Sequence, residues 1–125
     1  MTKSIFVFAS NLAGRHGAGS ALEAVKRFGA AKGNGIGRQG NAYAIPTKDG
    51  RGGADLKDPA QRLPLDAIQY HVRVFLDYAR QRPDYRFDVV AIGCGLSGYN
   101  AADIAPMFRG HSPNVHLPEA FRVLL

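Results

Sequence analysis

Asn11-Leu12-Ala13-Gly14-Arg15-His16-Gly17-Ala18-Gly19-Ser20-Ala21 is a glycine-rich segment that directly follows the apolar run Ile5–Ala9. The apolar run is short and bounded by turn residues, which is typical of a buried strand. From Ala18 to Phe28, apolar residues recur at helical spacing and charged residues take the other side, which predicts an amphipathic helix. The sequence therefore predicts a strand, a glycine loop and a helix, in that order.

The same order of elements recurs nearer the C-terminus. The apolar run Phe87–Ile92 predicts a strand, which is followed by Gly93-Cys94-Gly95-Leu96-Ser97-Gly98-Tyr99-Asn100 and by a short predicted helix from Ala101 to Phe108. Strands that alternate with helices predict an α/β sandwich, in which ligands bind outside the carboxyl ends of the strands. We expect both glycine loops on that rim of the sheet.

Two more elements are predicted between these units. Asn41–Ile45 is a strand-like run closed by Pro46. Apolar residues at helical spacing predict a helix that begins near Pro64 and stops before Pro83.

The rest of the chain completes one predicted domain over residues 1–125. Residues 48–62 are polar, contain several glycines and lack a period, so we expect a mobile surface loop. Val115–Leu117 and Phe121–Leu125 are expected to form one last strand, interrupted by a turn.

The composition favours a globular protein in the cytoplasm. The 46% hydrophobic and 21% charged residues are near globular averages, and no apolar run approaches the ~20 residues of a membrane span. Cys94 is the only cysteine and no secretory signal is evident, which excludes a disulfide framework and favours a cytoplasmic location.

The positive charge is concentrated in the N-terminal half. Residues 1–62 carry ten Lys or Arg against four Asp or Glu, which accounts for the net charge of +6, whereas residues 63–125 carry six against six. This imbalance indicates an anionic partner for the half that holds the first glycine loop. No stripe of basic and aromatic residues suggests nucleic acid in particular.

Two glycine patterns invite a nucleotide-binding interpretation, and only one fits its context. Gly35-Ile36-Gly37-Arg38-Gln39-Gly40 matches G-x-G-x-x-G but precedes a strand, so we do not interpret it as a dinucleotide fingerprint. The loop at Gly14–Gly19 follows a strand and opens a helix, where bare backbone and the helix dipole favour phosphate. It lacks the Lys-Ser/Thr ending of a P-loop. The structural alternative is a turn whose glycines serve packing.

Single reactive residues are weaker signals. Lys48 follows a predicted strand on the binding rim, but a lysine acts as a nucleophile only if its surroundings lower its pKa from about 10.4. Cys94 lies between two glycines, where a small buried cysteine is more common than a catalytic one. The four histidines show no metal spacing, so we predict no metal site.

Three blocks of sequence are more specific together than singly. They are Arg15-His16-Gly17-Ala18-Gly19-Ser20-Ala21 with Val25-Lys26-Arg27-Phe28-Gly29, Tyr43-Ala44-Ile45-Pro46-Thr47-Lys48, and Ile92-Gly93-Cys94-Gly95-Leu96. In this order they resemble the first loop and helix, the strand of the catalytic lysine, and the second phosphate loop of macrodomains of the terminal ADP-ribose protein glycohydrolase type.

The resemblance implies a compact macrodomain-like fold, a mixed sheet sandwiched between helices, with ADP-ribose in a cleft between the two loops. It implies a hydrolase that removes ADP-ribose from modified protein or nucleic acid without a cofactor, with Lys48 attacking the anomeric carbon. The chain is expected to be a monomer or weak dimer. The ligand contacts expected are Asn11, Arg15, Gly17, Ala18, Gly19, Ser20, Gly93, Cys94, Gly95, Leu96, Gly98 and Tyr99.

The chain departs from the family pattern at two positions. Ser97 stands where the family has an aspartate that assists as acid and base, and a hydroxyl cannot supply a carboxylate's basicity. We keep Ser97 as a catalytic candidate, with Asp49 or Asp103 as substitutes for the acid. Asn11 lies where many macrodomains use an aspartate on the adenine amino group, and its amide oxygen can accept the same hydrogen bond.

Three function classes follow. The first is the hydrolase with Lys48 as nucleophile. The second, favoured by Ser97, is a module that binds or sequesters ADP-ribose or a related nucleotide without cleaving it. The third is a nucleic-acid-binding protein that uses the basic N-terminal half.

Overall fold

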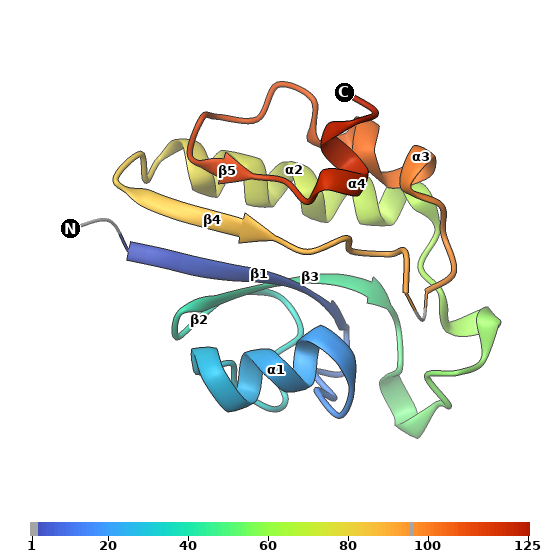
Figure 1. Ribbon diagram of the computed structural model, residues 1–125. Helices are drawn as coiled ribbons and strands as arrows, with labels where there is room; N and C mark the ends of the chain where they lie inside the picture. Colours follow the sequence, from blue (N-terminus) through green and yellow to red (C-terminus); the bar gives the residue numbers. More distant parts are fainter. Residues whose placement is uncertain (1–2, 96) are drawn as a thin grey trace.

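A computed structural model describes residues 3–95 and 97–125 and confirms the predicted α/β class. Its described strands form one mixed sheet in the order β2-β3-β1-β4-β5, in which β2 is antiparallel to β3 and the other neighbours are parallel (Figure 1). The strands are β1 (Lys3–Asn11), β2 (Gly37–Gln39), β3 (Ala42–Lys48), β4 (Tyr85–Val89) and β5 (Val115–His116).

Helices cover both faces of the sheet, so the protein has three layers. Helix α1 (Gly19–Phe28) covers one face, and α2 (Leu65–Arg80), α3 (Ala101–Ile104) and α4 (Glu119–Arg122) lie on the other (Figure 1). Helix α2 spans 16 residues. No helix within residues 3–95 and 97–125 is long and apolar enough to cross a membrane.

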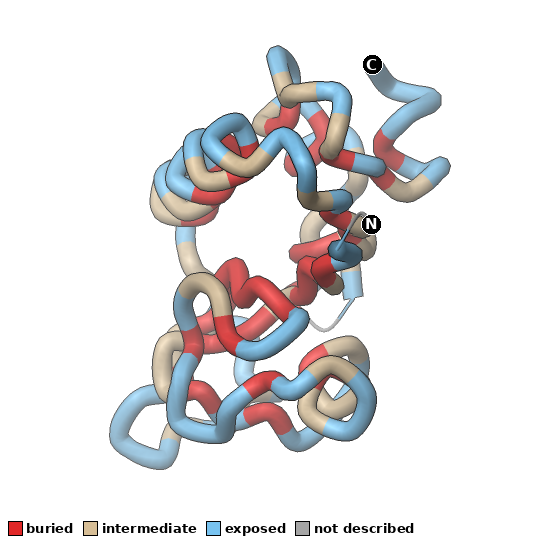
Figure 2. Tube along the Cα trace, turned by 90° about the vertical axis from the view of Figure 1, so that its left-hand side faces the viewer, coloured by how far each residue is buried: buried red, intermediate tan, exposed pale blue. Residues whose placement is uncertain are grey.

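The alternation of side chains along β1 divides the core in two. Ile5 and Val7 are fully buried on the α2 side, whereas Phe8 is fully buried on the α1 side. Period-two alternation within one strand explains how a short apolar run serves both cores. Figure 2 shows the buried positions concentrated between the layers, with exposed positions on the outer surfaces of the helices and loops.

Aromatic rings dominate the core on the α2 side. The ring of Phe75 lies 5.0 Å from that of Tyr43, 5.5 Å from that of Phe87 and 6.5 Å from that of Phe108, all at steep interplanar angles. Edge-to-face pairs of this kind add to the free energy gained by burying the rings. Helix α2 is thereby fixed against β3, β4 and the segment after α3.

The prediction of a final strand through Phe121–Leu125 is wrong. Within residues 115–125, all of which the structure describes, only Val115–His116 pairs with β4, and α4 begins after Pro118. Proline supplies no N–H for a ladder and is common at the start of a helix. Phe121 is fully buried, with its ring 5.7 Å from that of Phe108, so packing of this side chain favours the helical turn.

Strand β3 also differs from its expected bounds. It continues through Pro46 to Lys48, although proline usually ends a strand. The reason is that β2 pairs with β3 only as far as Ala44, so no strand in the described parts of the chain requires the missing N–H of Pro46 on that side. Strand β2 itself, within the G-x-G-x-x-G segment, was not expected from its sequence.

The 49–62 loop contains more structure than its composition suggested. It includes the 3-10 turns η1 (Arg51–Gly53) and η2 (Pro59–Gln61). Its two ends pair through a bridge between Lys48 and Arg62, and Asp49 N donates to Gln61 O at 2.8 Å. The loop therefore starts and ends next to the carboxyl end of β3.

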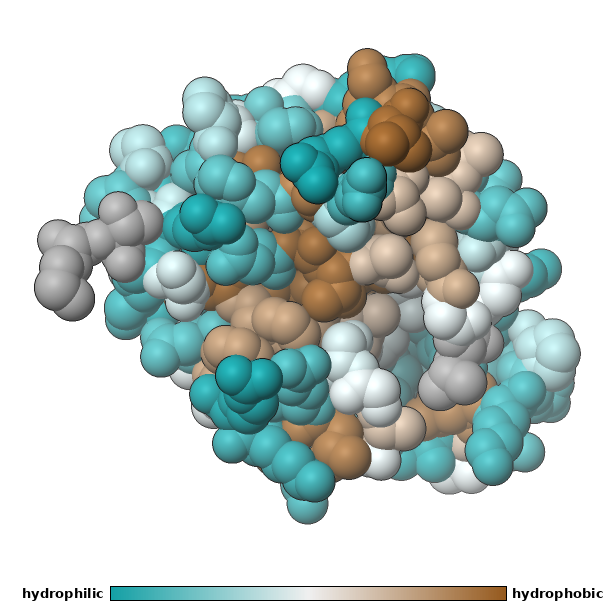
Figure 3. All heavy atoms as spheres, viewed as in Figure 1, coloured by the Kyte–Doolittle hydropathy of each residue, from teal (hydrophilic) through white to brown (hydrophobic). Residues whose placement is uncertain are grey.

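Apolar side chains are exposed near the C-terminus. Val123 is 71% exposed, and Leu124 and Leu125 are also exposed. Figure 3 shows hydrophobic surface gathered at this end of the molecule, at the top of the view. Residues after α4 thus lie outside both cores.

Candidate functional site

A cavity of about 600 Å³ opens at the carboxyl ends of three parallel strands. Asn11 lines it from the end of β1, Lys48 from the end of β3, and Val90 from the segment after β4. The chain leaves β1 toward β3 and leaves β4 toward β5, so the two connections diverge between these neighbouring strands. Such a switch point is where open α/β sheets bind ligands, which makes the cavity the candidate site.

Most of the residues singled out in the sequence line this cavity. Cys94, Gly98 and Tyr99 are not among its described lining residues, and Tyr99 Oη instead donates to Leu63 O at 2.6 Å. Leu96 lies outside the described residues. The expected residues that line the cavity are Asn11, Arg15, Gly17, Ala18, Gly19, Ser20, Lys48, Gly93, Gly95 and Ser97.

Asn11 and Arg15 hold the first glycine loop in shape. Asn11 Oδ1 accepts from Arg15 N and Asn11 Nδ2 donates to Arg15 O, both at 2.9 Å. This side-chain bridge engages the amide that we expected to accept from an adenine. Arg15 Nη2 donates to Gly50 O at 2.8 Å and also to Ala54 O, so Arg15 connects this loop to the 49–62 loop.

The positions near the cavity that hold glycine do so for two different physical reasons. A Cβ on Gly14 would lie 2.3 Å from Gly33 C, and a Cβ on Gly35 would lie 1.9 Å from Asn11 O, so these two glycines are required by close packing of backbone on backbone. In contrast, no described atom lies within 4 Å of a Cβ built on Gly17 or Gly95, and neither has a positive φ. Both border the cavity, where they leave backbone open to a ligand.

The N-terminus of α1 lies on the cavity without a side-chain cap. Ala18 is the N-cap residue, no side chain among the described residues caps this end by a hydrogen bond, and the first turn contains no acidic residue. Unpaired N–H groups and the helix dipole attract an anion at such an end. The cavity lining also contains three cationic side chains, Arg15, Lys48 and Lys57, and one carboxylate, Asp55, among the described residues. The electrostatics therefore favour an anionic ligand.

Lys48 is an unusually buried lysine. The residue is 7% exposed, and Nζ donates to Leu56 O of the 49–62 loop. Burial lowers the pKa of Lys48, and the Asp55 carboxylate acts in the opposite direction. A lysine with a lowered pKa, at the end of a strand and beside a cavity, fits a nucleophile or an anion contact.

Ser97 is buried beside Lys48's strand. It is 8% exposed, and its Oγ lies 2.7 Å from Thr47 Oγ1. Thr47 Oγ1 also donates a long hydrogen bond to Ser10 O, at 3.5 Å. The Ser97 hydroxyl thus connects the second glycine loop to β3. It borders the cavity, and its hydrogen-bond partner within the described residues is the hydroxyl of Thr47.

The two aspartates considered as substitutes for the family acid have other partners. Asp49 bonds Arg51 through both carboxylate oxygens, and this bonding lowers the pKa of Asp49. Asp103 caps α3, where Oδ2 accepts from Asn100 N at 3.1 Å. Asp55 lines the cavity instead. The sequence contained no signal for Asp55, because the loop that carries it has no period and its path depends on tertiary contacts.

Cys94 does not have the surroundings of a thiolate nucleophile. Its Sγ donates to Ile92 O at 3.5 Å and the residue packs against the larger core. Burial, followed by the charge of Asp103, raises the pKa of the Cys94 thiol. Within the part of the chain that the structure describes, no three His, Cys, Asp or Glu side chains are grouped to hold a metal ion.

The candidate site stands without support from a relative, because no protein-family model matches the sequence and no curated protein matches it either.

Proposed function

We propose that this chain is a macrodomain-like protein that binds ADP-ribose in the cavity and removes it from a modified protein or nucleic acid. Lys48 is the nucleophile in this proposal. The observation that carries it is the combination, on one cavity, of a buried lysine, the uncapped N-terminus of α1 and the open backbone of Gly17 and Gly95.

The diphosphate of the ligand lies between the two glycine loops. Neither packing nor backbone conformation requires a glycine at position 17 or 95. This supports the interpretation that glycine is present at both positions because a ligand approaches the backbone closely. Phosphate oxygens accept from backbone N–H groups at a helix N-terminus, and Arg15 adds a cation beside them. The cavity, about 600 Å³, lies within the size range of small-molecule and cofactor sites.

Lys48 attacks the anomeric carbon of the distal ribose as the neutral amine. Burial favours that form because it lowers the pKa of Lys48. The bond from the anomeric carbon to the target breaks with its electron pair, and the target leaves. Water then displaces the lysine from the same carbon, which gives free ADP-ribose and restores the amine.

A binding module that does not cleave its ligand is the second candidate. The observation in its favour is Ser97, because its hydroxyl pairs with Thr47 and cannot replace the carboxylate of the macrodomain hydrolases that the sequence resembles. Such a module would recognise ADP-ribosylated partners, or sequester free ADP-ribose, with the same cavity.

Calorimetric titration with ADP-ribose, AMP and NAD is the first test. We expect stoichiometric binding of ADP-ribose, with AMP much weaker. Absence of both heat and thermal shift with ADP-ribose would remove both candidates.

Single-turnover assays on aspartyl, glutamyl and nucleobase conjugates of ADP-ribose then separate them. Wild-type protein should release ADP-ribose, and Lys48→Ala should not. Lys26→Ala is the matched control, because Lys26 is an exposed lysine of α1 that does not line the cavity. Undiminished turnover in Lys48→Ala would exclude the lysine mechanism, and binding of conjugates that are returned uncleaved would favour the module.

A further inference from the structure

The 49–62 loop brings a carboxylate to the cavity. Asp55, Leu56 and Lys57 line it from this loop. Among the described lining residues, Asp55 is the only one with a carboxylate. Asp55 lies seven positions after Lys48 in sequence. The two ends of the loop between Lys48 and Arg62 pair with each other, and both Lys48 and Asp55 line the cavity.

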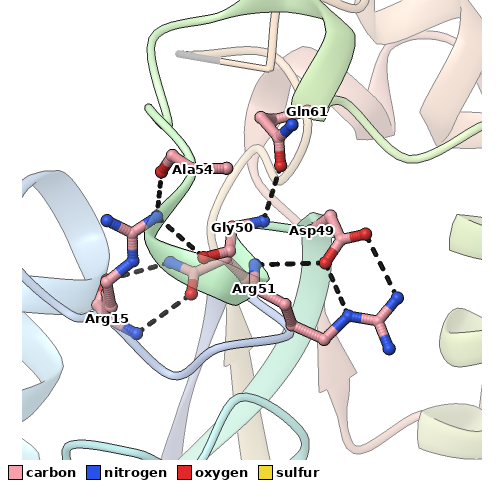
Figure 4. Close-up of polar contacts among 7 residues, drawn as sticks. Arg15, Asp49, Gly50, Arg51, Ala54 and Gln61 are labelled. Atoms are coloured by element: carbon pink, nitrogen blue, oxygen red, sulfur yellow. Dashed lines mark hydrogen bonds and ion pairs between the residues drawn. The ribbon is translucent and has the colours of Figure 1, made fainter.

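Both backbone neighbours of Asp55 are held by cations of the cavity. Arg15 donates to the carbonyl of Ala54, the residue before Asp55, and Lys48 Nζ donates to the carbonyl of Leu56, the residue after it. Figure 4 shows Arg15 reaching to Ala54 and Gly50 from the first glycine loop, while Asp49 is engaged by Arg51. Asp55 is therefore positioned by the same two side chains that line the proposed ligand site.

The Asp55 carboxylate retains hydrogen-bonding capacity. Oδ1 accepts from Lys57 N at 3.0 Å, which fixes the side chain locally. Within residues 3–95 and 97–125, Oδ2 has no hydrogen-bond partner or ion pair. Asp49 and Asp103, in contrast, are engaged by Arg51 and by the first turn of α3.

We propose that Asp55 is the acid–base residue of the hydrolase, supplied by the 49–62 loop in place of a carboxylate at Ser97. The inference rests on the proposed function. When the Lys48 nitrogen bonds to the anomeric carbon, Asp55 takes the proton that the nitrogen loses, and the target leaves with the electron pair of the broken bond. As water displaces the nitrogen from the anomeric carbon, Asp55 returns that proton to the nitrogen, which leaves as the neutral amine. Asp55 then takes a proton from the oxygen of the bound water, which leaves the hydroxyl of free ADP-ribose, and releases this proton to solvent.

The test compares Asp55→Asn with Asp58→Asn in single-turnover cleavage of an aspartyl ADP-ribose conjugate. Asp58 is an exposed aspartate of the same loop that caps η2, accepts from Ala60 N at 2.9 Å and does not line the cavity. Asparagine is also a good N-cap, so this control keeps the loop. We expect Asp55→Asn to lower the cleavage rate by about 10²-fold or more and Asp58→Asn to leave it unchanged.

Two further readouts separate chemistry from structure. Loss of a negative charge from the cavity should leave ADP-ribose affinity unchanged or raise it in Asp55→Asn, measured by calorimetry, because the diphosphate is anionic. Sodium formate, a small carboxylate, should raise the cleavage rate of Asp55→Ala and not that of Lys48→Ala.

The outcomes distinguish this inference from the proposed function. Wild-type cleavage with an equal rate in Asp55→Asn overturns the role of Asp55 and leaves the Lys48 mechanism in place. Slow cleavage that coincides with lost affinity and no response to formate also overturns it. A wild-type protein that binds ADP-ribose without cleaving any conjugate overturns the hydrolase, and the role of Asp55 with it.

Discussion

Alanine substitutions at Gly35 and Gly17 should have opposite effects on stability. A Cβ on Gly35 would lie 1.9 Å from Asn11 O and 3.0 Å from Asn11 C, so the two backbones must separate. Forced overpacking of this kind costs about 1–3 kcal/mol or more. A Cβ on Gly17 meets no described atom within 4 Å, and Gly17 has no positive φ. Gly17→Ala should therefore be neutral or stabilise the fold by about 0.4–1 kcal/mol through the unfolded chain.

Gly17→Ala, although it should not destabilise the fold, should weaken the binding of the ligand. Gly17 borders the cavity, so its new methyl group would occupy the space through which a phosphate approaches the backbone. We expect Gly17→Ala to weaken ADP-ribose binding at least about tenfold, which corresponds to ~1.4 kcal/mol. Urea denaturation measures the free energy of unfolding, and calorimetry measures the affinity. Wild-type stability in Gly35→Ala, or wild-type affinity in a folded Gly17→Ala protein, would refute this account of the glycines.

Two other substitutions test the core and the buried lysine. Phe75→Ala should lower the free energy of unfolding by about 3–5 kcal/mol in urea, because Phe75 is fully buried among aromatic rings, whereas Val123→Ala at an exposed position should not. Folding lowers the pKa of Lys48, so between the lowered pKa and about 10.4 the unfolded chain binds more protons than the folded protein, and the free energy of unfolding should rise with pH in that range. Urea denaturation of wild type and Lys48→Met from neutral to alkaline pH measures this rise as the difference between the two proteins. A difference that does not change with pH would contradict the lowered pKa.

Local sequence patterns predicted the helices and strands that have a clear apolar period or are bounded by proline or glycine. Strand β1, helix α1 and helix α2 follow runs whose period is unambiguous, and Pro64 and Pro83 bracket α2. The two glycine loops were expected on one rim because parallel strands end at the same edge of a sheet, and both contribute to the cavity.

The remaining features depend on contacts between distant segments. Phe121 is apolar in either a strand or a helix, and its burial against Phe108 selects the helix. Pro46 is tolerated in β3 only because β2 is short. Asp55 resembled any loop aspartate, since its position depends on Arg15 donating to the carbonyl of Ala54. None of these long-range contacts can be identified from the spacing of residues along the chain.

The unequal sizes of the two cores determine which layer opens first. On the α1 face the buried core consists of Phe8 and alanines such as Ala21 and Ala44, and the larger side chains Phe6, Val25 and Phe28 are only partly buried against it, whereas several aromatic rings are buried on the α2 face. Amide hydrogens exchange earliest where little apolar contact holds an element, so α1 should exchange before α2. A ligand bound at the N-terminus of α1 would slow amide exchange in α1, the helix that packs on the smaller core.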